Sequence, residues 1–324
     1  MAGEDKILKI DELSLSDQEF IQNILSGKAI PPLYSDIIAK RIFNPDVHAD
    51  RLNFLLRRIA KDETIEVSSS AGNENYKQSL YSKSMITDIP SWLKDGRAGD
   101  LEIQKVKQDF IFTRVELYAS DMLLLQYSVS EDEKKGDLAY TNVKEVILVV
   151  LMVESPKVFV DFKSDRYIHR FTEMRSDTGL SYPMKAKMIY VQLDKCLEQF
   201  KKGINGEEDD ELQLWLAMIA DVNDKSVEEK AENNEDLVKI RAEAMLMAQD
   251  KGVQEMLIQE KYDRMDWVTY GDERRREGEI KGTRQQMEKD ARGMYEEGLK
   301  PEVIARIQGI SVKEVEEILG LQMA

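Results

Sequence analysis

Two acidic residues stand where a hairpin would bring them together. Asp88 lies in the stretch KSMITDIPSWLKDG, and Glu102 and Gln104 follow in DLEIQK, with the turn at 94–96 between them. Glu102 and Gln104 are two residues apart, so both point to the same face of a strand. Two close carboxylates form a site for a hard divalent cation such as Mg²⁺ or Mn²⁺. Such a site can polarise a phosphoryl oxygen and activate a water, so the spacing favours metal-assisted hydrolysis.

The bulk composition is that of a globular chain of 324 residues with a net charge of −16. No run of 18 apolar residues predicts a membrane span, and the charged N-terminus is unlike a signal peptide. The single cysteine, Cys196, excludes an internal disulfide and suits a reducing, cytoplasmic setting. Residues 203–237 hold twelve acidic residues and two lysines. The remaining surface is therefore less acidic, which leaves room for a local basic groove that binds DNA.

The hydrophobic pattern predicts an α/β fold with a mixed sheet flanked by helices. Near-continuous apolar residues at 145–153 are typical of a central strand covered on both faces. The expected helices are 34–44, 49–61 and 109–128, and the expected strands are 63–69, 83–93, 100–106, 145–153, 156–163 and 186–193.

Four regions are predicted along the chain: an N-terminal helical extension (1–33), a nuclease-like domain (34–202), an acidic connector (203–237) and a charged helical tail (238–324). The connector is expected to hold one helix, about 210–220. One hypothesis is that its carboxylates lie over the active groove and mimic DNA.

The tail ends in a helix-turn-helix-like unit. Pro301 starts one helix, Gly309 makes the turn, and Ser311 with Glu314 caps the next. The second helix is acidic, which favours packing or dimerisation over reading a phosphate-lined groove, although DNA reading stays open. We expect a homo-oligomer formed through these C-terminal helices.

An ordered set of short motifs resembles the recombination-promoting nucleases of the Rpn family, which are also described as transposases. These belong to the PD-(D/E)xK nuclease superfamily. The matching pieces are Asp36, Lys40 and Phe43 in an early helix, Asp88 at an S-x-x-D strand, Lys94-Asp95-Gly96-Arg97 at a D-G turn, Glu102-Ile103-Gln104 at an E-x-Q strand, and Phe110, Arg114, Tyr118 and Ser120 in a following helix. The match covers about 36–200 plus the tail.

The resemblance implies a PD-(D/E)xK restriction-endonuclease-like core and a metal held by Asp88, Glu102 and the backbone carbonyl of Ile103. Gln104 takes the position of the usual lysine, where its amide can still hydrogen-bond a water. Asp36 is either a further metal ligand or a helix-start cap.

Three basic residues and a tyrosine complete the candidate set. Arg114 is either a phosphate ligand or the partner of a core carboxylate, and Tyr118 is either a core aromatic or part of the site. Lys40 and Lys105 are candidate DNA-binding bases, although a strand would turn Lys105 to the other face.

The sequence thus predicts a Mg²⁺-dependent DNA endonuclease linked to recombination or mobile elements. The alternative is a catalytically inactive protein that keeps the nuclease fold and acts in assembly or in binding DNA or protein. A close approach of Asp88 and Glu102 beside basic side chains favours the first.

Overall fold

A computed structural model describes residues 10–71, 88–108, 110–129, 143–204 and 208–321. It divides into two compact units, 1–258 and 259–324, each of which is described by itself. The polar stretch before Asp88 and the first part of the strand expected over 83–93 lie outside the described residues.

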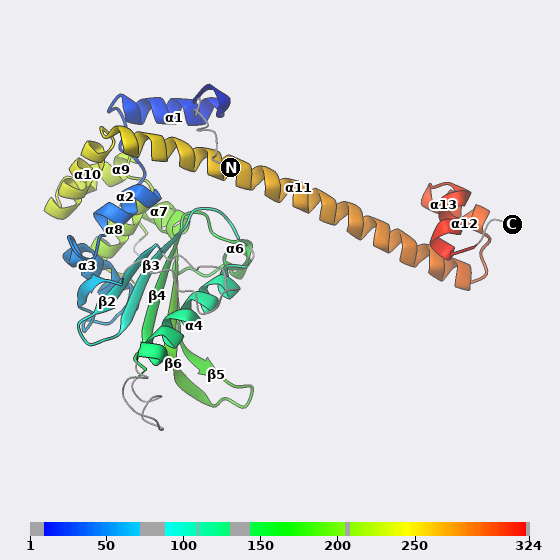
Figure 1. Cartoon of the computed structure of the whole chain (residues 1–324), viewed down its shortest axis with the longest axis horizontal. Coiled ribbons are helices and arrows are strands. Elements are labelled where there is room, and N and C mark those ends of the chain that lie inside the picture. The colour runs from blue at the N-terminus through cyan, green and yellow to red at the C-terminus, as the bar shows by residue number, and fades with distance from the viewer. Residues whose placement is uncertain (1–9, 72–87, 109, 130–142, 205–207, 322–324) are drawn as a thin grey trace. The chain divides into compact units, whose positions relative to one another are not determined.

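In the described part of the first unit, six strands form one mixed sheet of order β1-β2-β3-β4-β6-β5 (Figure 1). The pairs β1–β2, β2–β3 and β5–β6 are antiparallel, whereas β3–β4 and β4–β6 are parallel. The strands are β1 (Val67–Ser70), β2 (Ile89–Leu93), β3 (Ala98–Gln104), β4 (Val146–Met152), β5 (Ile168–Arg175) and β6 (Ser181–Gln192). All seven residues of the apolar β4 are buried, as expected for a strand covered on both faces.

The helices of the first unit are η1 (Ile10–Glu12), α1 (Leu15–Leu25), α2 (Asp36–Ile42), α3 (Ala49–Ala60), α4 (Ile111–Val129), α6 (Lys157–Phe162), α7 (Leu193–Lys201), α8 (Asp210–Ala220), α9 (Lys225–Ala231) and α10 (Glu235–Met247). Helix α11 (Lys251–Glu296) begins in the first unit and continues into the second.

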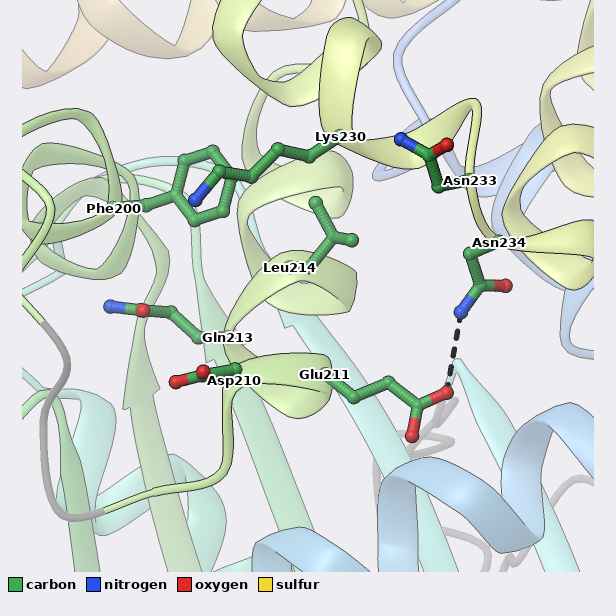
Figure 2. Close-up of a pocket in the computed structure, with 8 residues that line it drawn as sticks. All are labelled: Phe200, Asp210, Glu211, Gln213, Leu214, Lys230, Asn233 and Asn234. Carbon is green, nitrogen blue, oxygen red and sulfur yellow. Dashed lines mark hydrogen bonds between the residues drawn. The ribbon is translucent and has the colours of Figure 1, made fainter.

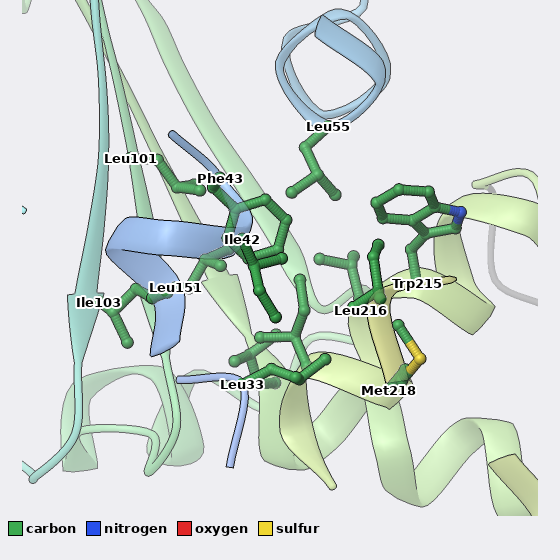
Figure 3. Packing of buried hydrophobic residues seen from close by; sticks show 14 of the residues in the cluster. Leu33, Ile42, Phe43, Leu55, Leu101, Ile103, Leu151, Trp215, Leu216 and Met218 are labelled. Atoms are coloured by element: carbon green, nitrogen blue, oxygen red, sulfur yellow. The ribbon is translucent and has the colours of Figure 1, made fainter. Parts of the chain in front are cut away.

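Side chains alternate between the two faces of the sheet, and each face has its own core. On what we call the α3 face, strand residues such as Leu101, Ile103 and Leu151 pack with α2, α3, α7 and α8 (Figure 3). On the opposite α4 face, strand residues such as Leu148 and Val150 pack with α4 and α6. The site described below lies on the α4 face.

Two expectations about the end of the sheet were wrong. The range 156–163 holds helix α6 with its two caps rather than a strand, because Pro156 serves as the N-cap and only Phe159 turns into the core. Strand β5 was not expected, because much of it is exposed and its polar residues hide the alternation.

The acidic stretch differs from the expected connector, because it supplies a core helix. Trp215 and Leu216 of α8 are buried on the α3 face, and Trp215 stacks on Phe54 with ring centroids 4.5 Å apart. Asp209 caps α8 by accepting from the Leu212 amide at 2.9 Å.

The acidic side chains near the start of α8 meet bases on the same side of the sheet. Asp209 pairs with Arg58 at 2.8 Å, and Glu208 pairs with Arg170 at 2.9 Å. These acids therefore neutralise bases on the α3 face and do not cover the α4 face, where Glu102 lies.

In the second unit, α12 (Pro301–Gln308) and α13 (Val312–Leu319) pack on the end of α11 around Ile304 and Val315. Gly309 makes the turn in a left-handed conformation, with φ of 71°. Ser311 and Glu314 form the expected capping box at the start of α13. None of the helices in the described ranges is long and apolar enough to cross a membrane.

Candidate active site

The start of β2 and the end of β3 place Asp88 beside Glu102. The antiparallel register pairs Ile89 with Leu101, so the preceding Asp88 falls next to Glu102 on the α4 face. The Asp88 carboxylate Oδ2 accepts from the Ile103 amide at 2.7 Å. In return, the Glu102 carboxylate Oε2 accepts from the Asp88 amide at 3.3 Å. Each acid thus holds the backbone of the other strand, and the two carboxylates lie close together.

Helix α4 adds a guanidinium to this pair. Arg114 Nη2 donates to Glu102 Oε1 at 2.6 Å, and Nη1 donates to Gln104 Oε1 at 3.3 Å. Arg114 and Tyr118 are one turn apart, and Arg114 Nε donates to the Tyr118 hydroxyl at 2.9 Å. The guanidinium also lies 5.3 Å from the centre of the Tyr118 ring. Arg114 therefore contacts a core carboxylate, Glu102, in the structure, and this contact is compatible with either of its expected roles, phosphate ligand or carboxylate partner.

Gln104 is held from two sides. Its side-chain Nε2 donates to the Val106 carbonyl at 2.9 Å, while its Oε1 accepts from Arg114. The side chain is buried at the last residue of β3, on the same face as Glu102. Its amide is thus fixed in orientation beside the two carboxylates.

A third acidic residue, Asp100, lies on the same face of β3 and was missed in the sequence. It pairs with Pro90 of β2 and with Leu148 of β4, and its side chain is fully buried. Neither carboxylate oxygen has a hydrogen-bond partner among the described residues. The signal was present as the period-two pattern D-x-E-x-Q over 100–104, which puts all three side chains on one face.

The site brings three largely buried acidic side chains, Asp88, Asp100 and Glu102, close together. Burial raises the pKa of Glu102 well above its usual value, and the charges of Asp88 and Asp100 raise it further. Burial likewise raises the pKa of Asp88. For Asp100, burial and then Asp88 raise the pKa to about 8, although the Ile89 and Leu101 amides favour the charged form in part. Without a cation, the raised pKa values mean that these carboxyl groups hold protons at a higher pH than isolated acids do.

Three further charged residues lie near enough to Asp88 to affect its pKa. Lys105 Nζ lies 2.6 Å from Asp36 Oδ1. Lys105 follows the last residue of β3, so the strand alternation that argued against it does not apply. The charges of Lys40 and Lys105 lower the pKa of Asp88, and that of Asp36 raises it. Asp36 is the first residue of α2, one position after the N-cap Ser35, so of its two alternatives the cap position itself belongs to Ser35.

The donor chemistry fits a hard divalent cation. The carboxylates of Asp88 and Glu102 are oxygen donors, and Asp100 offers two further oxygens with no hydrogen-bond partner among the described residues. The described residues contain no group of three or more His, Cys, Asp or Glu side chains already arranged around one ion. A cation at this site would therefore use the Asp88–Glu102 pair together with backbone oxygen and water.

A cavity of about 400 Å³ lies apart from these carboxylates, between α7, α8 and the α9–α10 connection (Figure 2). Lys230 covers the Phe200 ring at 4.8 Å, and Asn234 Nδ2 donates to Glu211 Oε1 at 3.2 Å.

Comparison with known families decides the class of protein. Residues 33–273 match the model of the PD-(D/E)XK nuclease family transposases, which is more than half of the chain. The chain belongs to this family. The family match extends past residue 200, the expected end of the main similarity, and takes in α8, α9, α10 and part of α11. This agrees with the burial of α8 in the core of the nuclease-like fold. No curated protein and no solved structure matches the chain.

Proposed function

We propose that this PD-(D/E)XK nuclease family transposase is a divalent-metal-dependent DNA endonuclease that serves recombination or mobile elements. The observation that carries the proposal is the reciprocal bonding of Asp88 and Glu102 across β2 and β3, with Arg114 against Glu102. Asp88, Glu102 and the backbone carbonyl of Ile103 would hold Mg²⁺ or Mn²⁺. When bound, the cation supplies a polarised phosphoryl oxygen and an activated water.

Arg114 is suited to bind the scissile phosphate. A guanidinium has five N–H donors. Three of them meet Glu102, Gln104 and Tyr118, which leaves two N–H groups without a partner among the described residues. A phosphate that accepts from these two groups would lie beside the carboxylate pair. Tyr118 then acts by holding the guanidinium in place.

Gln104 is suited to orient the attacking water. Its amide is fixed by Val106 and Arg114, and a fixed amide oxygen can accept a further hydrogen bond from a water. Lys40 and Lys105 add positive charge near Asp88. We propose that these two bases contact neighbouring phosphates of the DNA backbone, which would give a local basic site on an acidic protein.

One observation favours the alternative, an inactive nuclease fold used for assembly or binding. Arg114 already pairs with Glu102 at 2.6 Å, and such a pair can serve stability alone. Under this alternative, no divalent cation would bind at Asp88 and Glu102, and the second unit would carry the function by self-association. Light scattering of the full chain measures that self-association directly.

Cleavage of supercoiled plasmid with Mg²⁺ or Mn²⁺ tests the proposal. Asp88→Asn and Glu102→Gln should each reduce nicking by more than roughly 100-fold, the upper range for groups that support a metal site. Asp177→Asn, in an exposed turn, is the matched control and should keep full activity. Thermal denaturation should show that the site variants are folded. Full nicking by a folded Asp88→Asn protein would sink the proposal.

We also propose a cytoplasmic location. Cys196 is buried and free, with its Sγ 3.7 Å from the Gln213 carbonyl. Burial raises the pKa of this thiol, so it behaves as a core residue that needs no oxidising compartment. Separation of cytoplasmic and periplasmic or secreted fractions of expressing cells, followed by detection of the native chain, measures the location.

A further inference from the structure

We propose that Asp100 is a third acidic residue of the cation site, which increases the affinity for a divalent cation held by Asp88 and Glu102. The inference rests on the proposed metal dependence and adds a residue and a role to it. Asp100 is not placed as a direct ligand, because the described acidic side chains do not surround a single ion. Its contribution is negative charge close to the ion.

Asp100 is carried to this position by the strand itself. On β3 it is two residues before Glu102, so both side chains leave the same face of the sheet. Its neighbours in the adjacent strands are Pro90 and Leu148, which are apolar. The Asp100 side chain is fully excluded from solvent.

The Asp100 carboxylate lacks the partners that a structural acid has. Both of its oxygens are without a hydrogen bond among the described residues. Burial of a carboxylate is unfavourable unless its lost solvation is replaced, and here the nearby Ile89 and Leu101 amides favour the charged form only in part. A fully buried valine would avoid this cost, and an uncharged asparagine would carry less of it. The ionised carboxylate therefore costs stability unless positive charge beyond that of Arg114 comes close to it.

The charged groups that face Asp100 come from each element packed around it. Asp88 from the start of β2 and Glu102 from β3 are negative, and Arg114 from α4 is positive. One guanidinium thus faces three carboxylates. Lys40 and Lys105 lie beyond Asp88, where Asp36 offsets part of their charge. A divalent cation between Asp88 and Glu102 would bring the missing positive charge to within reach of Asp100.

Calorimetric titration of Mn²⁺ into the full chain tests the role of Asp100. Asp100→Asn should bind Mn²⁺ about tenfold more weakly than wild type, the lower range for groups that support a metal site from outside its ligand set. Asp62→Asn is the matched control, because Asp62 is a partly buried acid that pairs with Arg97 on another part of the sheet. The control should keep the wild-type affinity.

Thermal denaturation without divalent cations supplies a second measurement. Asp100→Asn and Asp100→Val should melt at or above the wild-type temperature, whereas Asp62→Asn should melt below it. Added Mn²⁺ should raise the melting temperature of wild type more than that of either Asp100 variant.

The outcomes separate this inference from the proposed function. Unchanged Mn²⁺ affinity in folded Asp100→Asn overturns the inference and leaves the metal site standing. Failure of both Asp100 variants to fold would show that the carboxylate is structural, which also overturns it. Wild type that binds no Mn²⁺ contradicts the proposed function itself.

Discussion

Two arginine-centred clusters lie at opposite ends of strand β3. At its start, Arg97 contacts Asp62 at 2.6 Å, Asp95 at 2.7 Å and Thr64 at 2.8 Å; we call these four residues the Arg97 cluster. At its end lies the Arg114 cluster, made of Asp88, Asp100, Glu102 and Arg114. In the first cluster both carboxylates contact the guanidinium. In the second, one guanidinium faces three carboxylates, and Asp100 has no partner among the described residues.

One acid in each cluster shows the difference, because the pKa of Asp62 is lowered and that of Asp100 is raised. Burial alone would raise the pKa of Asp62, but Thr64 and Arg97 outweigh it and lower the pKa to about 2. Burial raises the pKa of Asp100 to about 8, and Arg114 offsets this only in part. In the Arg97 cluster, pairing with the guanidinium outweighs burial and favours the charged form of Asp62. An excess of buried acids instead creates a site that needs protons or a cation.

The largest expected effect comes from removing the guanidinium of the paired cluster. Arg97→Met should lower the free energy of unfolding by about 1 to 3 kcal/mol, because it leaves partly buried carboxylates without their partner. Urea denaturation measures this loss. At a temperature where the variant is folded, its Mn²⁺ affinity should equal that of wild type; a marked loss of affinity would mean that the clusters are not independent.

The pH dependence of stability should separate the clusters next. Asp100 has a raised folded pKa, so its contribution is fully present below pH 4 and is lost as the pH rises toward about 8, by at most about 1.4 kcal/mol per pH unit. Asp62 has a lowered folded pKa, so its contribution is present above pH 4 and is lost as the pH falls toward about 2.

Chemical denaturation across pH 3 to 9 without divalent cations measures how the free energy of unfolding changes with pH in both ranges. Asp100→Asn should reduce the fall in the free energy of unfolding between pH 4 and 8. It should leave the pH dependence below pH 4, which comes from Asp62, unchanged. An identical profile for wild type and Asp100→Asn would contradict the raised pKa.

Removal of the guanidinium from the acidic cluster should affect cation binding. Arg114→Met should bind Mn²⁺ roughly tenfold more tightly, equivalent to about 1.4 kcal/mol, because Arg114 no longer competes for Glu102 Oε1. Nicking should nevertheless fall, since the phosphate loses its proposed partner. Calorimetry and plasmid cleavage on the same preparation measure the two effects. Weaker Mn²⁺ binding would show that Arg114 supports the carboxylates instead of competing for them.

The smallest expected effect is at Tyr118. Tyr118→Phe removes the hydroxyl that accepts from Arg114 Nε and should cost about 1 kcal/mol of stability. The ring remains beside the guanidinium, so Mn²⁺ affinity should stay unchanged and nicking should fall by less than about tenfold. A complete loss of nicking would instead give the hydroxyl a direct part in the reaction.

The sequence predicted the α/β class and the sheet because its strongest pattern, the apolar β4, permits few other structures. The approach of Asp88 and Glu102 could be predicted because the turn at 94–96 joins two adjacent strands and fixes which of their residues lie opposite each other. Asp100 was missed because a single acid before an acidic motif is more typical of a surface residue, so the period-two pattern over 100–104 was not followed back to it, and its full burial is known only from the tertiary structure. Lys105 was assigned to the other face because the end of β3 cannot be located from the sequence to within one residue.

The acidic stretch shows a different limit. Its twelve acids suggested an acidic connector with one helix, whereas the apolar residues of that helix, α8, decide its position in the core. Burial of Trp215 on the α3 face outweighs the surrounding charge, which Arg58 and Arg170 partly neutralise. Such long-range pairs are not visible in a single sequence.

The central claim is that the Asp88–Glu102 pair binds a divalent cation. Calorimetric titration of Mn²⁺ into wild type, Glu102→Gln and the control Asp62→Asn tests it most directly. We predict saturable binding with equal affinity in wild type and Asp62→Asn, and loss of that binding in folded Glu102→Gln. Equal binding by Glu102→Gln and wild type, or no binding by wild type, would contradict the claim.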